Sequence, residues 1–302
     1  CSSWYYLRYL YPSSDDKPFD SNISKDWMPV DLYIGGAEHA TMHLLYARFI
    51  TKALRDIGYL AFNEPFKKLY HQGTITKDGA KMSKSKGNTV SPDEFIDKYG
   101  SDVLRCYLMF MGPYDEGGDW NDRGITGVSK FLSKVYSVIQ IEGGDSDPKA
   151  IKMIHKTLKL VTSDLDNFKF NTAISRMMEM VNLLISSKTL SKNDKCFIVK
   201  MISPFAPHLG EELWAFLENE NSSIFNSKWP NYDKALALDS EVEIGVQVNG
   251  KLRGSVLISK DAGKDVVLSL SKEIENIKKY IAEGELVKEI YVPGKIINFV
   301  IK

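Results

Sequence analysis

Hydrophobic positions in the first hundred residues follow a strand–turn–helix pattern. Residues 29–35 form a short apolar run that ends on glycines, which is typical of a buried parallel strand. Residues 37–57 then carry apolar side chains at helical spacing. A second apolar run at 68–75 leads into a lysine-rich segment, and Ser91-Pro92 opens another helix. This order predicts part of a doubly wound α/β sheet.

The hydrophobic pattern becomes helical after a connector at 115–120 that is rich in glycine and acidic residues. Long amphipathic segments with few glycines run from about 125 to 218, and they predict a helical bundle. One predicted helix covers residues 170–186, where the apolar residues, including Met177 and Met180, share one face. These methionines are predicted to lie in the core rather than to form a binding stripe.

Alternation with a period of two marks the last part of the chain, beyond a linker at about 219–239. Apolar residues alternate with other residues between 242 and 248, and Asn249-Gly250 is a strong hairpin signal. A helix near 270–282 and a strand pair around Pro293-Gly294 complete a predicted small α+β domain. The chain is therefore predicted to be multidomain, with an α/β part at 1–114, an all-α part at 115–235 and an α+β part at 240–302.

Composition limits what these parts can do. The 302 residues include 43% hydrophobic and 26% charged residues, as in an ordinary soluble globular protein. Because 39 basic residues balance 39 acidic ones, contact with a nucleic acid must come from local patches. Three widely spaced cysteines argue for a reducing compartment, and neither a secretory signal nor a membrane-spanning apolar run is evident. We therefore expect a cytoplasmic protein.

Residues 81–88, Lys-Met-Ser-Lys-Ser-Lys-Gly-Asn, carry the clearest chemical signal, and we name them the lysine loop. Three lysines alternate with two hydroxyls and end on a turn-forming pair, so the loop can bring ammonium groups and hydroxyl donors to a polyphosphate. Most lysine-rich runs are solvated surface loops, and that interpretation competes here. The apolar anchor Met82 and the ordered alternation favour the phosphate-binding interpretation.

A second candidate site lies at 35–43, where the predicted strand meets the predicted helix. Ligands bind at such crevices in open α/β sheets, and Gly35 and Gly36 let the backbone approach one closely. Glu38 can accept hydrogen bonds from a ribose diol. His39 and His43 are four residues apart and therefore share a helix face. A zinc site is one interpretation of this pair, but Glu38 precedes the two histidines rather than separating them and no third ligand is evident. Structural histidines and a substrate pocket wall both stay open, and the neighbouring glycines and Glu38 support the wall.

Several segments together resemble one enzyme family. The lysine loop is similar to the second signature motif of class I aminoacyl-tRNA synthetases, and the segment at 35–49 resembles the leucyl-tRNA synthetases of bacterial type. The other segments that carry this resemblance are residues 2–9, 170–173, 204–208 and 246–251. The resemblance spans nearly the entire chain. It implies the second half of a class I Rossmann-like catalytic domain, a helical anticodon-binding-type bundle and a C-terminal tRNA-binding domain.

The resemblance implies roles for individual residues in leucine activation by ATP. Lys81 and Lys84 are expected to neutralise the triphosphate of ATP, which binds as its Mg²⁺ complex, and to stabilise the charge that develops during reaction. No tightly bound cofactor and no protein-bound metal are expected. The other residues expected at ATP are Gly35, Gly36, Glu38, Gln72, Gly73, Met82, Ser83 and Ser85.

The resemblance also implies leucine and tRNA(Leu) as partners. His39, His43, Tyr5 and Ser2 are expected to line the leucine pocket. The bundle and the last domain are expected to bind the tRNA body. The charge of residues 241–302 supports this only weakly, because ten Lys or Arg stand against nine Asp or Glu. Lys251 and Arg253 are the expected phosphate contacts, although a solvated strand end explains them nearly as well.

The chain also departs from the pattern of that family. The first signature, a His-Ile-Gly-His-like tetrad, is absent, as are the first half of the nucleotide-binding fold and any editing insertion. The N-terminal half of the same enzyme is therefore an expected partner, in the same chain or as a split subunit, and this chain is not expected to aminoacylate alone. Its start at Cys1 favours a fragment. A non-catalytic tRNA-binding subunit or fragment is the alternative.

Overall fold

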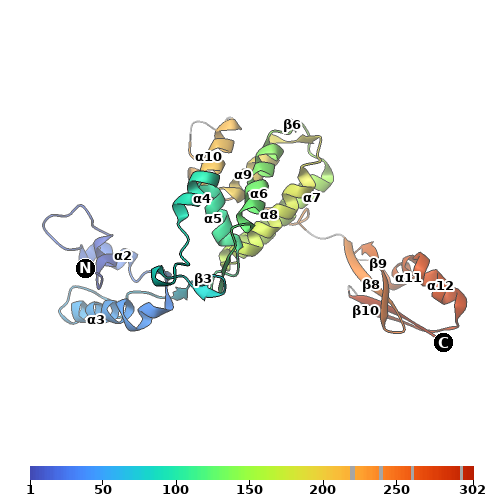
Figure 1. Cartoon of the computed structure of the whole chain (residues 1–302), viewed down its shortest axis with the longest axis horizontal. Helices are drawn as coiled ribbons and strands as arrows, with labels where there is room; N and C mark the ends of the chain where they lie inside the picture. The colour runs from blue at the N-terminus through green and yellow to red at the C-terminus, as the bar shows by residue number, and fades with distance from the viewer. Residues whose placement is uncertain (218–221, 238–240, 260–261, 293–294) are drawn as a thin grey trace. The chain divides into compact units, whose positions relative to one another are not determined.

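The structure, a computed structural model, describes residues 1–217, 222–237, 241–259, 262–292 and 295–302. The chain divides into two units, Cys1–Tyr232 and Asp233–Lys302 (Figure 1). Each unit has its own buried apolar residues, so each is described by itself. The predicted boundaries at 114, 115, 235 and 240 remain predictions. No described helix is both long enough and apolar enough to cross a bilayer.

The first unit begins with a small sheet and the helices beside it. Strand β1 (Tyr33–Gly35) pairs in parallel with β2 (Leu69–His71), which confirms the predicted parallel strand. This sheet has only two strands, and Ile34 in its middle is 42% exposed, so the prediction that the strand is buried was wrong. The other elements of this part are α1 (Tyr5–Arg8), α2 (Ser21–Trp27), η1 (Ala37–Thr41) and α3 (His43–Asp56).

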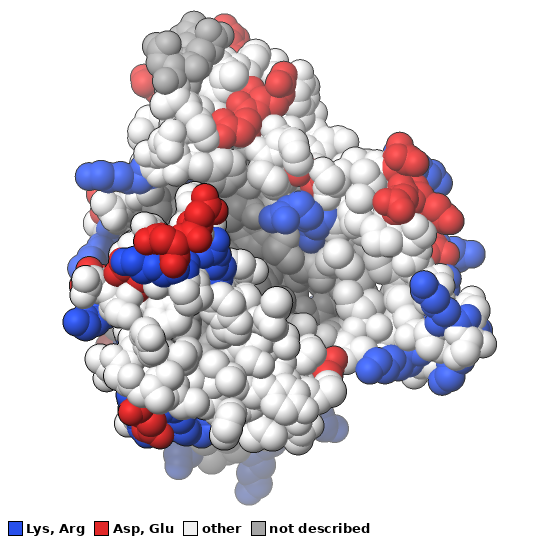
Figure 2. Space-filling view, turned by 90° about the vertical axis from the view of Figure 1, so that its left-hand side faces the viewer, with Lys and Arg blue, Asp and Glu red and all other residues white. Residues whose placement is uncertain are grey.

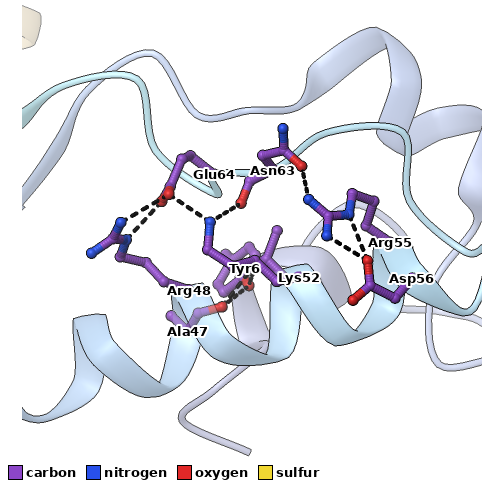
Figure 3. Close-up of polar contacts among 9 residues, drawn as sticks. Tyr6, Ala47, Arg48, Lys52, Arg55, Asp56, Asn63 and Glu64 are labelled. Carbon is purple, nitrogen blue, oxygen red and sulfur yellow. Dashed lines mark hydrogen bonds and ion pairs between the residues drawn. The ribbon is translucent and has the colours of Figure 1, made fainter.

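Helix α3 is fixed on both sides by contacts with distant segments. On its buried side, the Tyr6 hydroxyl bonds to the Thr51 hydroxyl at 2.5 Å and donates to the Ala47 carbonyl at 3.1 Å. On its exposed side, Glu64 accepts hydrogen bonds from both Arg48 and Lys52 (Figure 3). These contacts hold the helix that carries one wall of the site described below.

A three-stranded sheet connects this part to the helices. Its order is β4 (Ala80–Lys81), β3 (Thr74–Lys77), β5 (Gly117–Trp120), with β3 and β4 antiparallel and β3 and β5 parallel. The lysine loop leaves β4, forms the short turn η2 (Lys84–Lys86) and leads to α4 (Pro92–Tyr99) and α5 (Ser101–Phe110). The helix predicted to open at Ser91-Pro92 is thereby confirmed.

The predicted helical bundle is present and holds the largest buried apolar cluster among the described residues. Met177 and Met180 are fully buried in it, so their predicted place in the core is confirmed. Helix α5 packs against α6 and α8. The elements are α6 (Gly124–Ile139), β6 (Glu142–Gly143), α7 (Pro148–Asp166), α8 (Phe170–Leu184), β7 (Thr189–Leu190), α9 (Lys192–Ile202), α10 (Pro207–Phe216) and η3 (Ile224–Asn226).

The second unit is a four-stranded sheet with two helices. Its strands are ordered β10 (Leu286–Val292), β11 (Ile296–Ile301), β8 (Glu241–Val248), β9 (Lys251–Ser259). Asn249 and Gly250 both have positive φ angles, 49° and 78°, as the predicted hairpin turn requires. The helix predicted near 270–282 is instead two, α11 (Lys264–Lys272) and α12 (Glu275–Glu283). The predicted turn at Pro293-Gly294 lies outside the described residues. The mixed α/β, all-α and α+β fold class is confirmed.

Candidate functional site

A cavity of about 400 Å³ lies at the carboxyl ends of β1 and β2. That position is where open parallel sheets bind ligands, and the volume suits a small organic molecule. Seven of the residues singled out from the sequence line it: Ser2, Tyr5, Gly35, Gly36, His39, His43 and Gln72. Tyr33, Ile34, Leu44 and Leu69 complete the lining. The structure therefore brings together residues from five segments of the chain around one cavity.

Two tyrosines and a histidine form a hydrogen-bonded chain in the cavity wall. The hydroxyls of Tyr5 and Tyr33 bond to each other, and the Tyr33 hydroxyl lies 2.7 Å from Nε2 of His43. The Tyr5 ring also stacks on the His43 ring, with 5.5 Å between ring centroids. Burial and the hydrogen bond from Tyr5 raise the pKa of Tyr33, so its hydroxyl stays neutral and available for hydrogen bonding. This wall of the cavity is therefore aromatic, and its polar groups are the two tyrosine hydroxyls and the His43 imidazole.

Tyr33 was not among the site residues predicted from the sequence. Side chains two apart along a strand lie on the same face, so Tyr33 lies on the same face of β1 as Gly35. That spacing was a usable signal once Gly35 had been singled out. The contact with Tyr5, which lies 28 positions earlier in the chain, leaves no local pattern in the sequence.

His39 and His43 do meet, although they do not lie on one continuous helix as expected. His39 is in η1, His43 begins α3, and the backbone of Met42 between them departs from helical geometry, with φ −122° and ψ −101°. The two imidazole rings are nearly perpendicular, with centroids 6.1 Å apart. Within the described residues, no three His, Cys, Asp or Glu side chains are arranged to hold a metal ion. Both rings line the cavity, as the pocket-wall interpretation expects.

Glu38 lies beside the cavity rather than in its lining. Its carboxylate folds back toward Gly36. A Cβ atom built on Gly36 would lie only 2.4 Å from one of the carboxylate oxygens. Any side chain at position 36 would therefore have to displace Glu38. The Glu38 side chain is flexible and exposed, so this close approach shows where its carboxylate lies and does not by itself require glycine at position 36.

Gln72 and Gly73 connect this cavity to a second hollow of about 170 Å³. Gln72 lines both, and Gly73 lines the second. The Gly73 amide donates to the carbonyl of Tyr114 at 2.8 Å, and a Cβ atom on Gly73 would lie only 2.0 Å from the amide nitrogen of Gly117. Glycine at position 73 is thus required by backbone packing between the start of β3 and the start of β5.

The lysine loop is ordered by its own internal contacts. Asn88 accepts from the Ser83 amide at 2.9 Å and donates to the Lys81 carbonyl at 3.4 Å, and Ser83 bonds to Ser85 at 3.2 Å. Gly87 ends η2 with φ 66°, a left-handed conformation that favours glycine. These contacts close the loop into a compact turn.

The two lysines predicted to be catalytic are exposed, and neither lines the two cavities. Met82 packs against the buried cluster of the bundle, which confirms its predicted role as an apolar anchor. Lys81 and Lys84, on either side of this anchor, are exposed to solvent. The face drawn in Figure 2 carries charged side chains in small separate groups, with large uncharged areas between them.

Lys251 and Arg253 lie at the start of β9 in the second unit. The pairing register shifts there, so Arg253 has no partner on β8, whereas Leu252 faces Gln247 and Gly254 faces Val246. This is a β-bulge, which re-aims a side chain. The Arg253 guanidinium lies over the Tyr280 ring, 4.9 Å from its centroid, beside a hollow of about 370 Å³ that Lys279 also lines. Lys279 was not singled out from the sequence.

Comparison with known proteins decides the family. Residues 2–121 match the family of class I tRNA synthetases (I, L, M and V), and residues 147–268 match the anticodon-binding domain of tRNA ligases. Over its whole length the chain is 45% identical to the leucine–tRNA ligase of Petrotoga mobilis and 46% identical to that of Clostridium beijerinckii. The chain belongs to the leucine–tRNA ligase family. The resemblance predicted from the sequence is thereby confirmed.

The chain spans only part of its relatives in the leucine–tRNA ligase family. It covers 39% of the Petrotoga mobilis protein and 40% of the Clostridium beijerinckii protein. A crystal structure of Agrobacterium radiobacter LeuRS in a ternary complex with tRNA and LeuAMS matches the entire chain, with a TM-score of 0.74 and 36% identity. The chain covers 42% of that protein. The fold described above is thus that of a leucine–tRNA ligase over the matching region.

Proposed function

We propose that this chain acts as part of a leucine–tRNA ligase, which activates leucine with ATP to leucyl-adenylate and transfers the leucyl group to tRNA(Leu). The observation that carries the proposal is the cavity at β1 and β2, because it joins Tyr5, His39 and His43 to the glycine-rich turn. The chain runs from that cavity through β2, β3 and β4 to the lysine loop. Membership of the leucine–tRNA ligase family supports the same reading.

In this proposal the cavity holds the leucine side chain. Ile34, Leu44 and Leu69 supply apolar wall, and the hydrogen bond between Tyr33 and His43 fixes the ring that closes it. Ser2 lies at the same cavity. Such a wall discriminates by shape, and one methylene group is worth about 1–3 kcal/mol in a pocket of this kind.

ATP, as its Mg²⁺ complex, is the proposed second substrate. Gly35, Gly36 and Glu38 are proposed to hold its ribose, and Gln72 and Gly73 to lie near its adenine. Lys81 and Lys84 stabilise the negative charge that develops on the α-phosphate and on the departing pyrophosphate, with Ser83 and Ser85 as hydroxyl donors. The carboxylate of leucine attacks the α-phosphate, so the protein contributes position and charge rather than a covalent step.

The remaining partners follow from the family. The other wall of the activating site is proposed to come from the N-terminal half of the same enzyme, since the chain spans 39% of a full-length relative. The bundle and the second unit are proposed to hold tRNA(Leu), and the cytoplasm is the proposed location. Catalysis is assigned to the assembled site rather than to this chain alone.

Leucine-dependent exchange of pyrophosphate into ATP, measured with the N-terminal half supplied, tests the catalytic proposal. Lys84→Ala is expected to lower the rate by about 100-fold or more, because it removes a charge that acts in the transition state. Lys130→Ala is the matched control, since it removes the same charge from an exposed position on α6. A Lys84→Ala rate within a few-fold of the control would contradict the role of the lysine loop.

A second function, tRNA binding without catalysis, is favoured by the second unit. That unit has its own core and presents Arg253 from a β-bulge, with Lys279 nearby. If Lys251 and Arg253 contact phosphates, replacing both by Ala weakens binding of tRNA(Leu) and reduces the slope of log K against log salt by about two. Filter binding across a salt series checks this, with Lys264→Ala/Lys288→Ala as the control pair. An unchanged slope would exclude these two contacts.

A further inference from the structure

The hairpin that carries the lysine loop is held by a side chain outside the loop. Asp119 lies in β5, directly opposite Thr76 of β3 in the parallel register. Its carboxylate oxygen Oδ1 accepts a hydrogen bond from the Thr76 hydroxyl at 2.5 Å and a second from the Gly79 amide at 2.9 Å. One carboxylate oxygen therefore ties together the strand and the turn of the β3–β4 hairpin.

The turn to which Asp119 bonds is a tight one at Asp78 and Gly79. Asp78 and Gly79 both have positive φ angles, 55° and 70°, the geometry of a tight two-residue hairpin. Asp-Gly is a favoured pair for this turn, because aspartate tolerates a positive φ angle and glycine adopts one freely. The short β4 strand pairs with β3 through only Ala80 and Lys81, and Lys81 is the first residue of the lysine loop. A shift of this turn therefore moves Lys81 directly.

The next residue along β5 anchors the same strand in the bundle. Trp120 is buried, and its ring meets the rings of Phe95 in α4 and Tyr107 in α5 edge to face, at 4.8 and 5.1 Å. Its indole N–H donates to Asp122 at 2.7 Å. Because Asp119 and Trp120 are neighbours, the hairpin is linked to the helical bundle by one short rigid strand.

We propose that Asp119 is a positioning residue, which holds the β3–β4 hairpin where Lys81 and Lys84 can reach the phosphates of ATP. This inference rests on the proposed function for its catalytic consequence, while the clamp itself rests only on the contacts above. The hydrogen bonds from Thr76 and Gly79 keep the pKa of Asp119 below its ordinary value, so the carboxylate is ionised at neutral pH. Charge-assisted hydrogen bonds of this kind are stronger than neutral ones.

The first test examines the clamp without catalysis. Trypsin cleaves after lysine, and Lys77, Lys81, Lys84 and Lys86 all lie in or beside the loop. Asp119→Asn and Thr76→Val are expected to speed cleavage there several-fold, since each removes part of the clamp. Thr76→Ser keeps the hydroxyl donor and is expected to be cleaved at the wild-type rate. Glu116→Gln, which removes an exposed charge from the same connector, is the matched control.

The second test separates positioning from general destabilisation. In leucine-dependent pyrophosphate exchange, Asp119→Asn and Thr76→Val are expected to lower kcat about 10- to 100-fold, because small misplacements of reacting groups have effects of this size. The KM for leucine should stay unchanged, and Thr76→Ser should match the wild type. The double variant Asp119→Asn/Thr76→Val should be no worse than either single variant, since both break one clamp.

The outcomes distinguish this proposal from the proposed function. Cleavage and kcat within twofold of the Glu116→Gln control would overturn the positioning role, as would a KM for leucine that rises in parallel with the fall in kcat. Faster cleavage with unchanged kcat would overturn it as well. If the wild-type chain, supplied with the N-terminal half, catalyses no exchange, the proposed function fails, and the tryptic cleavage alone then decides whether Asp119 clamps the hairpin.

Discussion

At the scale of single residues, Glu64 shows how one carboxylate fastens the helix that forms the site wall. Arg48 and Lys52, one helical turn apart on α3, both donate to it at 2.7 Å (Figure 3). The hydrogen bond from Arg48, the larger cause, and the one from Lys52 lower the pKa of Glu64 to about 2. Glu64→Gln is expected to reduce the free energy of unfolding by about 0.5–1 kcal/mol at pH 7, since the side chains are well exposed and solvent screens them.

The sign of the pH dependence follows from that lowered pKa. Stabilisation by the Glu64 ion pairs is fully present above the ordinary pKa of about 4.5 and is lost as the pH falls toward 2. The difference between wild type and Glu64→Gln, measured by urea unfolding at several pH values, should therefore shrink across this range. A difference that stays constant down to pH 2 would contradict the assignment.

Residue-level prediction from the sequence succeeded where a local pattern exists. Gly35 and His39 were found because glycines followed by an acid and two histidines stand out after a strand. Tyr33 was not found, because its role depends on Tyr5 and His43, and their approach is a property of the fold. The sequence predicted Asp119 only as part of a connector. Its hydrogen bond from the Gly79 amide joins residues 40 positions apart, so no local pattern indicates it.

At the scale of elements, Asp102 joins the helix pair that follows the lysine loop to the last helix of the bundle. Its carboxylate accepts from Nδ1 of His208 at 2.9 Å and from the Leu209 amide at 2.8 Å, at the N-terminus of α10. The Asp102 side chain is thus a cap supplied to α10 by another helix. Anions at that end of a helix are stabilising.

Replacing Asp102 therefore tests how α5 and α10 are coupled. Asp102→Asn keeps the shape but loses the charge and one acceptor, so we expect a loss of about 1–2 kcal/mol in the free energy of unfolding. Thermal unfolding of the variant measures this. Asp97→Asn on the exposed face of α4 is the control and should change stability by less than about 0.5 kcal/mol. Equal effects of the two substitutions would show that the cap is not stabilising.

Helices and strands were predicted well where short-range chemistry determines them. The hairpin at Asn249-Gly250 is as expected, and α8 was predicted at 170–186 against Phe170–Leu184. Two expected helices are each divided, one at Met42 and one between Lys272 and Glu275. Apolar spacing continues across both breaks, so the sequence pattern alone contains no signal for them.

At the scale of the whole molecule, the first unit presents an apolar stripe on α3. Leu45, Tyr46 and Phe49 follow helical spacing and are between 53% and 68% exposed, and Met42, just before the helix, is 45% exposed. Single exposed apolar residues are common, but a contiguous row of this kind marks a surface that another part of a protein covers. The two-stranded sheet beside it is also too small for an independent sheet. Both features agree with a chain that spans 39% of a full-length relative.

The second unit contrasts with this, because its apolar residues are buried within itself. Ile244, Val246, Ile277, Ile297 and Phe299 are fully buried between its sheet and its two helices. Sequence alternation predicted this domain, because a half-buried strand is read directly from a period of two. The overall net charge of zero, in contrast, carried no information about which face binds a partner.

We therefore expect Asp233–Lys302 to fold on its own. Produced alone, it should show dispersed amide resonances and a cooperative thermal transition, since it has one closed core and its 70 residues exceed the roughly 40 below which domains usually need disulfides or metals to fold. Phe299→Ala should abolish or nearly abolish this transition, because deleting a buried phenylalanine costs about 3–5 kcal/mol. Val287→Ala, at a side chain that is 60% exposed, should leave the transition almost unchanged. Random-coil resonances in the wild-type unit would show instead that its core depends on the rest of the chain.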